Sequence, residues 1–184
     1  PHGLAAPLHS LDAAGRDVWP IEGYLDEGPR STNWLADGVI KQHRTIETYF
    51  TLLRRAGFGP TPAEVATFSA LGHEQAVSRL VDFESIDNSA LETRLTQLSL
   101  DLGEIVQIYY WWLYRMLYTA RPLEEKLTLF WHGHFATSFA KVNDPGFMLA
   151  QNQLFRLRAV GDFQQTLIEV SADPAMLFWL DNVV

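Results

Sequence analysis

Apolar residues recur at helical spacing along most of the chain after Lys41. In the stretch KQHRTIETYFTLLRRA (residues 41–56), they are separated by steps of three and four residues: Ile46, Tyr49, Phe50 and Leu53. Such a period places its members on one face of an α-helix. The glycines and the proline of GFGP (residues 57–60) then end the pattern. The stretch therefore predicts a helix with one apolar stripe.

Proline and capping residues mark the starts of further helices. Thr61-Pro62-Ala63-Glu64 has the pattern of a capping box with proline at the first helical position. Asp-Pro pairs combine a side-chain acceptor with a preset φ angle. We expect helices to start near four prolines: Pro62, Pro122, Pro145 and Pro174. The helix that starts at Pro122 is expected to continue to Lys141. We also expect a helix after Gly72 and one long helix from Asn88 or Ser89 through Tyr118.

The first forty residues differ in composition from the rest of the chain. They hold four of the nine prolines and five of the twelve glycines, with no sustained period. We interpret residues 1–40 as an extended Pro/Gly-rich arm that contacts a helical body through aromatic residues: Trp19, Tyr24 and Trp34. Residues 41–184 are expected to form a helical domain. The predicted fold is all-α, an irregular multi-helix orthogonal bundle with an extended N-terminal arm.

Composition narrows the class of protein. A hydrophobic fraction of 47% and a charged fraction of 20% over 184 residues are typical of a globular domain. The net charge of −8 disfavours a general role in binding nucleic acid, because a surface of that sign repels phosphates. The absence of cysteine excludes disulfides and thiolate chemistry. The most apolar stretch, residues 105–118, is shorter than the roughly 20 residues that a membrane span requires.

Two histidines in FWHGHF (residues 130–135) are the first candidates for chemistry. Residues two apart on a helix point about 200° away from each other. His132 and His134 could therefore bind one metal only if Gly133 distorts the helix, and the HExxH spacing is missing. We predict no metal site and identify no cofactor. One of the two, chiefly His134, is a candidate catalytic residue; the alternative is that both are buried structural imidazoles.

A second polar cluster lies in QNQLFRLR (residues 151–158). Asn152 and Arg156 are one turn apart, and Gln151 and Arg158 lie two turns apart on a similar face. Carboxamides and guanidiniums can together hold a carboxylate, a phosphate or a sugar. Gln151, Asn152 and Arg156 are therefore candidate substrate-binding residues. The alternative is a structural network that fixes this helix to its neighbours. Counted back from the turn at residues 142–145, His134 and Gln151 stand at comparable distances along their helices. We therefore expect His134 to face the core, close to residues 151–156 on the neighbouring helix.

Arg115 follows the aromatic stretch YYWWLY (residues 109–114). A guanidinium in such surroundings must be paired with a carboxylate or stacked on a ring, because an isolated buried charge is very costly. Glu104, Asp101 or a more distant carboxylate could be the partner. We expect Arg115 to be mostly buried, and we add it to the candidate substrate-binding residues.

Long segments of the chain resemble a bacterial family known as domain of unknown function 1800. They are LLRRAGFGPTPAEV (residues 52–65), WWLYRMLYTARPLEEKLTLFWHGHFATS (111–138), QNQLFR (151–156) and DPAMLFWLDN (173–182). The resemblance covers about three-quarters of the chain and corresponds to the N-terminal portion of the family. It implies a bacterial origin and often an exported protein, for which the periplasm or cell envelope would be the compartment after signal removal; the sequence itself leaves the localisation unknown. It implies no established reaction.

These observations leave two hypotheses of function. In the first, the chain is part of an exported enzyme whose site is completed by sequence beyond Val184. In the second, it is a non-catalytic helical module that binds a partner protein or an envelope polymer. The dense run MLFWL (residues 176–180) needs a cover. A protein partner, a C-terminal half or a sequence-distant segment is expected to cover Phe178 or Trp179.

Overall fold

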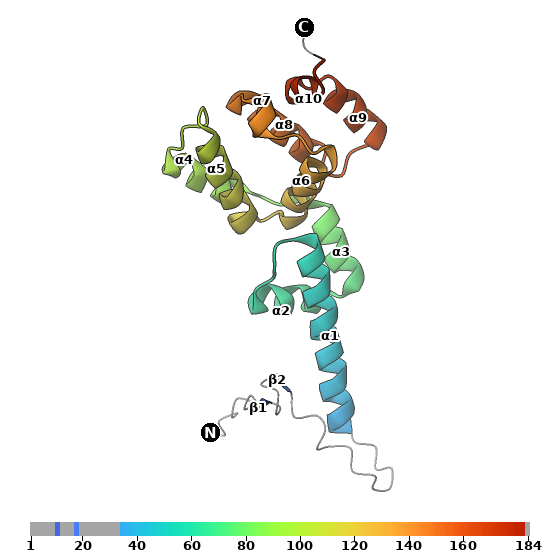
Figure 1. Cartoon of the computed structure of the whole chain (residues 1–184). Coiled ribbons are helices and arrows are strands. Elements are labelled where there is room, and N and C mark those ends of the chain that lie inside the picture. The colour runs from blue at the N-terminus through green and yellow to red at the C-terminus, as the bar shows by residue number, and fades with distance from the viewer. Residues whose placement is uncertain (1–9, 12–16, 19–33, 183–184) are drawn as a thin grey trace. The chain divides into compact units, whose positions relative to one another are not determined.

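Helices and the short turns between them make up nearly all of the chain from Trp34 onward. The computed structural model describes residues 10–11, 17–18 and 34–182. Its helices are α1 (Trp34–Ala56), α2 (Pro62–Leu71), α3 (His73–Val81), the 3₁₀ turn η1 (Phe83–Ser85), α4 (Ser89–Leu98), α5 (Ile105–Tyr118), α6 (Pro122–Phe135), α7 (Phe139–Val142), α8 (Pro145–Leu157), α9 (Phe163–Ser171) and α10 (Pro174–Trp179) (Figure 1). The predicted all-α fold class is confirmed.

The chain divides into two units, residues 1–40 and 41–184. In the first, strand β1 (Ser10–Leu11) pairs antiparallel with β2 (Asp17–Val18), a short ladder that we did not predict. Trp19 and Tyr24, two of the aromatic residues expected in the arm, lie outside the described residues. Helix α1 begins at Trp34, seven residues before the predicted start at Lys41, so the helical segment begins within the predicted arm.

All four proline-based helix starts are confirmed. In α2 the side chain of Thr61 accepts from the Glu64 amide, and the Glu64 carboxylate accepts from the Thr61 amide at 2.6 Å. Asp144 and Asp173 cap α8 and α10 by accepting from the amide three residues ahead. These side chains satisfy amides that the helix leaves without a partner, which explains the starts of α2, α8 and α10. Helix α6 has no side-chain cap, and its start is set by Pro122 at the first helical turn.

The single long helix predicted through Tyr118 is wrong. Ser99 has a left-handed backbone (φ 49°) that ends α4. The carboxylate of Asp101 then accepts from the Gly103 amide at 2.9 Å, and the Asp101 amide donates to the Gln107 side chain at 2.8 Å. These local bonds stabilise a turn in place of helical bonds.

Two further helix boundaries differ from the prediction. A left-handed residue, Ala136 (φ 54°), ends α6 at Phe135, although we had expected the helix to continue to Lys141. Helix α9, capped by Asp162, was not predicted.

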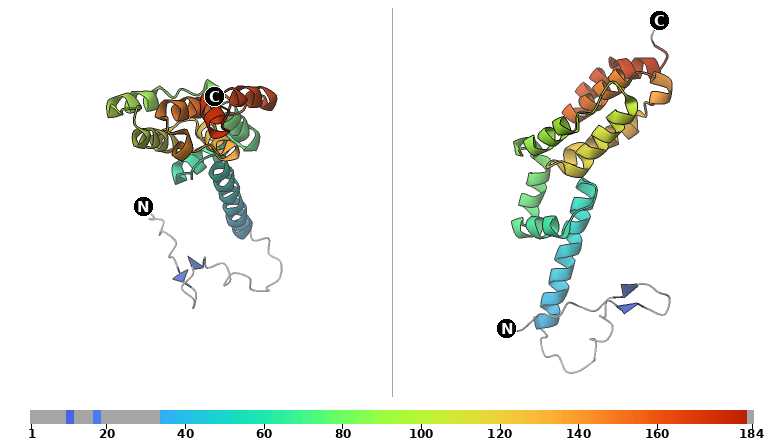
Figure 2. Two further views of the ribbon diagram at one scale, coloured as in Figure 1. Left: turned by 45° about the horizontal axis from the view of Figure 1, so that its top comes forward. Right: turned by 90° about the vertical axis from the view of Figure 1, so that its left-hand side faces the viewer.

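The core of the second unit consists of several apolar clusters between helices. Helices α1, α2 and α3 enclose one cluster: Tyr49, Leu53, Ala56, Val65, Ala76 and Leu80. The predicted apolar stripe of α1 is thus only half buried, since Ile46 and Phe50 are exposed. A second cluster joins α4 and α5, and two more lie around α8, α9 and α10. Helices α6 and α8 pack along each other and contact α5 (Figures 1 and 2).

The C-terminal apolar run is partly covered: Phe178 and Trp179 contact sequence-distant residues, as predicted, while Phe178 and Leu180 remain 40% and 57% exposed. The ring of Phe178 lies 5.5 Å from that of Phe147, and Trp179 packs against two of the clusters around α8 and α10. The Lys141 ammonium lies 5.6 Å from the Trp179 ring centroid and donates to the Trp179 carbonyl. Among the described residues, no helix has both the length and the apolar character needed to cross a membrane.

A buried hydrogen-bond chain fixes α8 to the start of α10. The Thr137 hydroxyl donates to the Gln151 carbonyl oxygen, and the Gln151 amide nitrogen donates to Asp173 at 2.7 Å. The same Asp173 oxygen accepts from the Met176 amide at 2.9 Å. Burial raises the pKa of Asp173, against the lowering effect of these hydrogen bonds.

Replacing Asp173 with alanine tests this chain. The change removes a helix cap and leaves the buried Gln151 amide without its acceptor, so we expect a loss of about 2–4 kcal/mol in unfolding free energy. Asp162→Ala is the matched control, because Asp162 caps α9 from an exposed position and should lose about 0.5–2 kcal/mol. Equal losses in the two variants, measured by urea unfolding, would contradict a special role for the Gln151–Asp173 bond.

Candidate functional site

A fully buried carboxylate on α6 holds two guanidiniums from neighbouring helices. Glu125 is 0% exposed. Its Oε1 accepts from Arg115 Nε at 2.9 Å and from Arg156 Nε at 2.8 Å, and its Oε2 accepts from Arg156 Nη2 at 3.0 Å. The pair with Arg156 is therefore bidentate, the geometry in which guanidinium and carboxylate interact most strongly. Glu125 joins α5, α6 and α8 at one point.

Each partner comes from the helix end that suits its charge. Arg115 lies in the last turn of α5 and Arg156 in the last turn of α8. Cations are stabilised there, because the carbonyl end of a helix carries partial negative charge. Asn152, one turn before Arg156, accepts from Arg156 Nη2 at 2.7 Å. The predicted pair of Asn152 and Arg156 is thus a real contact, and it orients the guanidinium.

Trp111 and Glu92 complete the surroundings of the two arginines. The guanidinium carbons of Arg115 and Arg156 each lie 5.0 Å from the centroid of the Trp111 ring, within the range of cation–π attraction. Glu92 on α4 pairs with the terminal nitrogens of Arg115 at 2.9 and 3.3 Å. Burial disfavours the charge of Arg115, but the hydrogen bonds to Glu92 and Glu125 outweigh that effect and raise its pKa. The prediction that Arg115 is buried and paired is confirmed.

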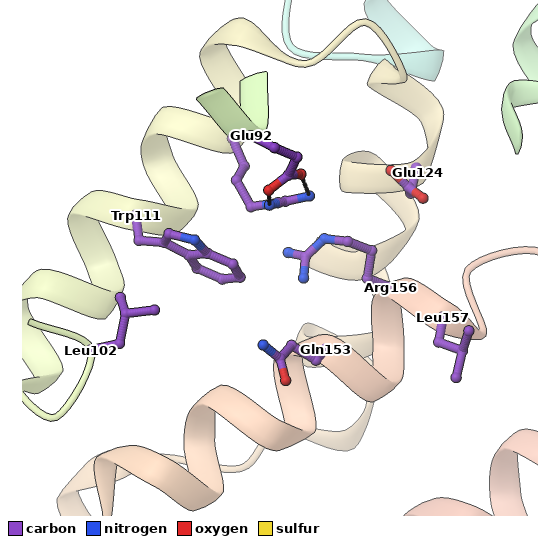
Figure 3. Close-up of a pocket in the computed structure, with 8 residues that line it drawn as sticks. Glu92, Leu102, Trp111, Glu124, Gln153, Arg156 and Leu157 are labelled. Atoms are coloured by element: carbon purple, nitrogen blue, oxygen red, sulfur yellow. Dashed lines mark hydrogen bonds and ion pairs between the residues drawn. The ribbon is translucent and has the colours of Figure 1, made fainter. Parts of the chain in front are cut away.

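These residues border an open pocket of about 510 Å³ (Figure 3). The Arg156 guanidinium and the Trp111 ring lie next to each other at this pocket, with the Gln153 carboxamide below them in the view. Its lining combines charged, polar and apolar side chains: Glu92, Leu102, Trp111, Arg115, Glu124, Gln153, Arg156 and Leu157. Most of these side chains are charged or polar and three are apolar, a lining that can contact both the polar and the apolar parts of a small organic molecule.

Glu124 is a second acidic group of the pocket, in the first turn of α6. Burial raises its pKa, and the nearby Glu125 charge adds to that effect; Arg121, Arg156 and Arg115 act in the opposite direction. Its nearest cation is Arg121, with 3.6 Å between Nη1 and Oε1. A carboxyl group whose pKa is raised beside a pocket is suited to exchange a proton with a bound molecule.

The structure places the two histidines in different surroundings. His134 is exposed, and its ring contacts lie on its own helix: Phe130, Trp131 and Phe135. The expectation that His134 faces the core beside residues 151–156 is wrong. His132 faces α8 instead, with its ring 6.5 Å from Phe155 and 5.3 Å from Trp112. Neither histidine lines the pocket.

The polar cluster of residues 151–158 separates into three parts. Gln151 is fully buried in the chain with Thr137 and Asp173, away from the pocket lining. Asn152 and Arg156 belong to the network of Glu125. Arg158 pairs with Glu169 on α9, with Nε 2.7 Å from Oε2. Of the predicted substrate-binding residues, Arg115 and Arg156 line the pocket. Asn152 does not line it, but accepts a hydrogen bond from Arg156.

Sequence reasoning did not identify Glu92, Glu124 and Glu125 as site residues. A signal existed for Glu125, which shares a helical stripe with Leu129 and His132 at steps of four and three. That signal is only partial, because Leu129 is exposed in the structure although Glu125 is fully buried. Among the described residues, no group of three or more His, Asp or Glu side chains is arranged to hold a metal ion.

Comparison with known proteins gives a family and no function. Residues 51–184 match the family model described as "Protein of unknown function (DUF1800)". No curated protein and no solved structure gives a significant match.

Removing the charge of Glu125 should strongly destabilise the fold. Glu125→Gln leaves two guanidiniums in the core without their shared counter-charge, and breaking a buried pair in this way costs about 3–5 kcal/mol. Glu74→Gln makes the same charge change at an exposed position and should stay within about 0.5 kcal/mol of the wild type. A similar stability of the two variants in urea unfolding would contradict the network.

The burial of His132 should make stability depend on pH. Burial lowers its pKa below the ordinary value of 6.5, so the folded chain binds fewer protons at this site than the unfolded chain. The His132 contribution is therefore fully present above pH 6.5 and decreases as the pH falls toward the folded-state pKa. We expect His132→Gln to reduce the slope of unfolding free energy against pH in that window; an unchanged slope would refute the assignment.

Proposed function

We propose, for a chain that belongs to the DUF1800 family of proteins of unknown function, that the pocket beside Arg115 and Arg156 binds a polar organic ligand as part of an enzyme active site. In this proposal the two arginines bind the ligand and Glu124 exchanges a proton with it. The observation that carries the proposal is the fixed position of two guanidiniums at the wall of an open pocket.

Preorganisation of the arginines supports a role in binding. The side chains of both are about nine-tenths buried, and each is fixed by Glu125 and by the Trp111 ring. An arginine held this way loses little conformational entropy when a ligand binds. Arg156 Nη1 makes no hydrogen bond to any described residue, so its donors are available to an acceptor on the ligand.

The chemistry of Glu124 supports the enzymatic part of the proposal. General acid–base catalysis requires a group that can give or take a proton near the working pH. The direction of the pKa shift of Glu124 brings it closer to that range than an exposed carboxyl group. Glu125, in contrast, is occupied by two guanidiniums and lies outside the pocket lining. Adjacent carboxylates thus have separate roles, one for proton transfer and one for positioning.

An interaction module is the alternative function, and one observation favours it. Helix α5 exposes a continuous apolar stripe at steps of three and four residues: Val106, Tyr109, Tyr110, Leu113 and Leu117. Contiguous exposed apolar surface of this kind is typical of a face that contacts another protein. The stripe lies outside the pocket lining, so the two functions involve different residues.

A matched pair of substitutions separates these functions. Leu157 lines the pocket and is 73% exposed, while Leu117 is 72% exposed on the α5 stripe. Leu157→Trp should fill the pocket without disturbing the core and weaken binding of a ligand found by NMR screening of small polar compounds by at least about tenfold. Leu117→Trp should leave that binding unchanged. Loss of ligand binding in Leu117→Trp alone would favour the module and contradict the pocket.

A further inference from the structure

The buried part of the site carries an excess positive charge. Arg115 and Arg156 together contribute two positive charges, and the Glu125 carboxylate between them contributes one negative charge. The group of three is therefore left with one positive charge, which requires a further anion nearby. In the structure that anion is Glu92, whose two oxygens contact the two terminal nitrogens of Arg115.

Glu92 differs from the other members of this group in its exposure. Its side chain is 56% exposed, whereas those of Arg115 and Glu125 are 9% and 0% exposed. An ion pair with one exposed partner is weak, because water solvates the free carboxylate nearly as well as the guanidinium does. Glu92 can therefore be exchanged for another anion at small cost, while Arg115 itself cannot turn away from the pocket without breaking its bond to Glu125.

We propose that the ligand carries a carboxylate, and that the Glu92 carboxylate competes with it for Arg115. This inference rests on the ligand-binding function proposed above. The incoming carboxylate takes the place of Glu92 on the terminal nitrogens of Arg115 and also accepts from Arg156 Nη1. Displacement of Glu92 into solvent keeps the buried group electrically balanced throughout. The exchange breaks no covalent bond and requires no further reactant.

The rest of the pocket indicates the other part of the ligand. Leu102, Leu157 and the Trp111 ring provide apolar walls beside the two guanidiniums (Figure 3). They suit an organic body attached to the carboxylate better than a small inorganic anion. The Glu124 carboxylate repels a negative ligand. The Arg121 guanidinium, with Nη1 3.6 Å from Glu124 Oε1, offsets part of the negative charge of Glu124. The inferred ligand class is an organic acid with an apolar or aromatic body.

Removing the competing carboxylate of Glu92 tests the inference. Sodium benzoate is the probe, and benzamide is its uncharged counterpart of nearly the same shape. Binding is followed by NMR through the Arg115 and Arg156 Nε–H signals at constant ionic strength. Glu92→Gln should bind benzoate at least tenfold more tightly than the wild type, and benzamide equally in both. Glu74→Gln, an exposed glutamate outside the pocket, controls for the change in net charge and should behave as the wild type.

Each outcome decides the inference. Equal benzoate affinity in Glu92→Gln and Glu74→Gln would overturn it, and so would an equal gain for benzamide. Glu92→Ala, checked for an unchanged unfolding midpoint, serves as a second variant if Glu92→Gln is unstable. If Leu157→Trp abolishes binding of a screened ligand while Glu92→Gln gains nothing for benzoate, the pocket function stands and the carboxylate inference fails. If Glu92→Gln instead binds benzoate more tightly while Leu157→Trp leaves binding of the screened ligand unchanged, the carboxylate site is supported. The pocket is then rejected as the binding site of the screened ligand.

Discussion

The Glu125 carboxylate has no access to water, so its charge must be neutralised inside the protein. This requirement determines the organisation of the domain. Glu125 meets that requirement with two guanidiniums from different helices. Because the three groups come from α5, α6 and α8, the position of one charge fixes the relative position of three helices. A well-packed apolar side chain at this point would often be as stable or more so. The buried ionic group at the edge of the pocket is therefore the feature on which the proposed binding function rests.

The polar residues of α8 look alike in the sequence, but the structure gives them different roles. Gln151 faces the start of α10 and completes a helix cap, whereas Asn152 faces Arg156 and orients a guanidinium. Consecutive residues on a helix point in directions about 100° apart, so each contacts a different neighbour. One side of α8 thus stabilises the fold, and the adjacent side supports the pocket.

Local signals made most of the fold predictable, and the errors have local causes. Proline at the first helical turn and Asp or Thr caps act within four residues, so the starts of α2, α6, α8 and α10 could be inferred from the sequence. The break after α4 depends on a left-handed serine and on side-chain bonds of Asp101, which no apolar period reveals. The two strands and the early start of α1 had no clear signal.

The site was less predictable, because it depends on which helix faces meet. The burial of Arg115 followed from its aromatic surroundings, but its partner lies ten residues away on another helix. His134 was assigned to the core by counting distances back from a turn, and the helix ends six residues earlier than that count assumed. The face that meets α8 therefore contains His132 and Glu125.

A double-mutant cycle between Glu125 and Arg156 tests the central claim most directly. Unfolding free energies are measured for the wild type, Glu125→Gln, Arg156→Met and the variant with both changes. If the bidentate pair is formed in the core, removing both partners should cost less than the sum of the single losses, with a coupling of at least about 1 kcal/mol. Additive losses would show that the two side chains do not interact and would contradict the account.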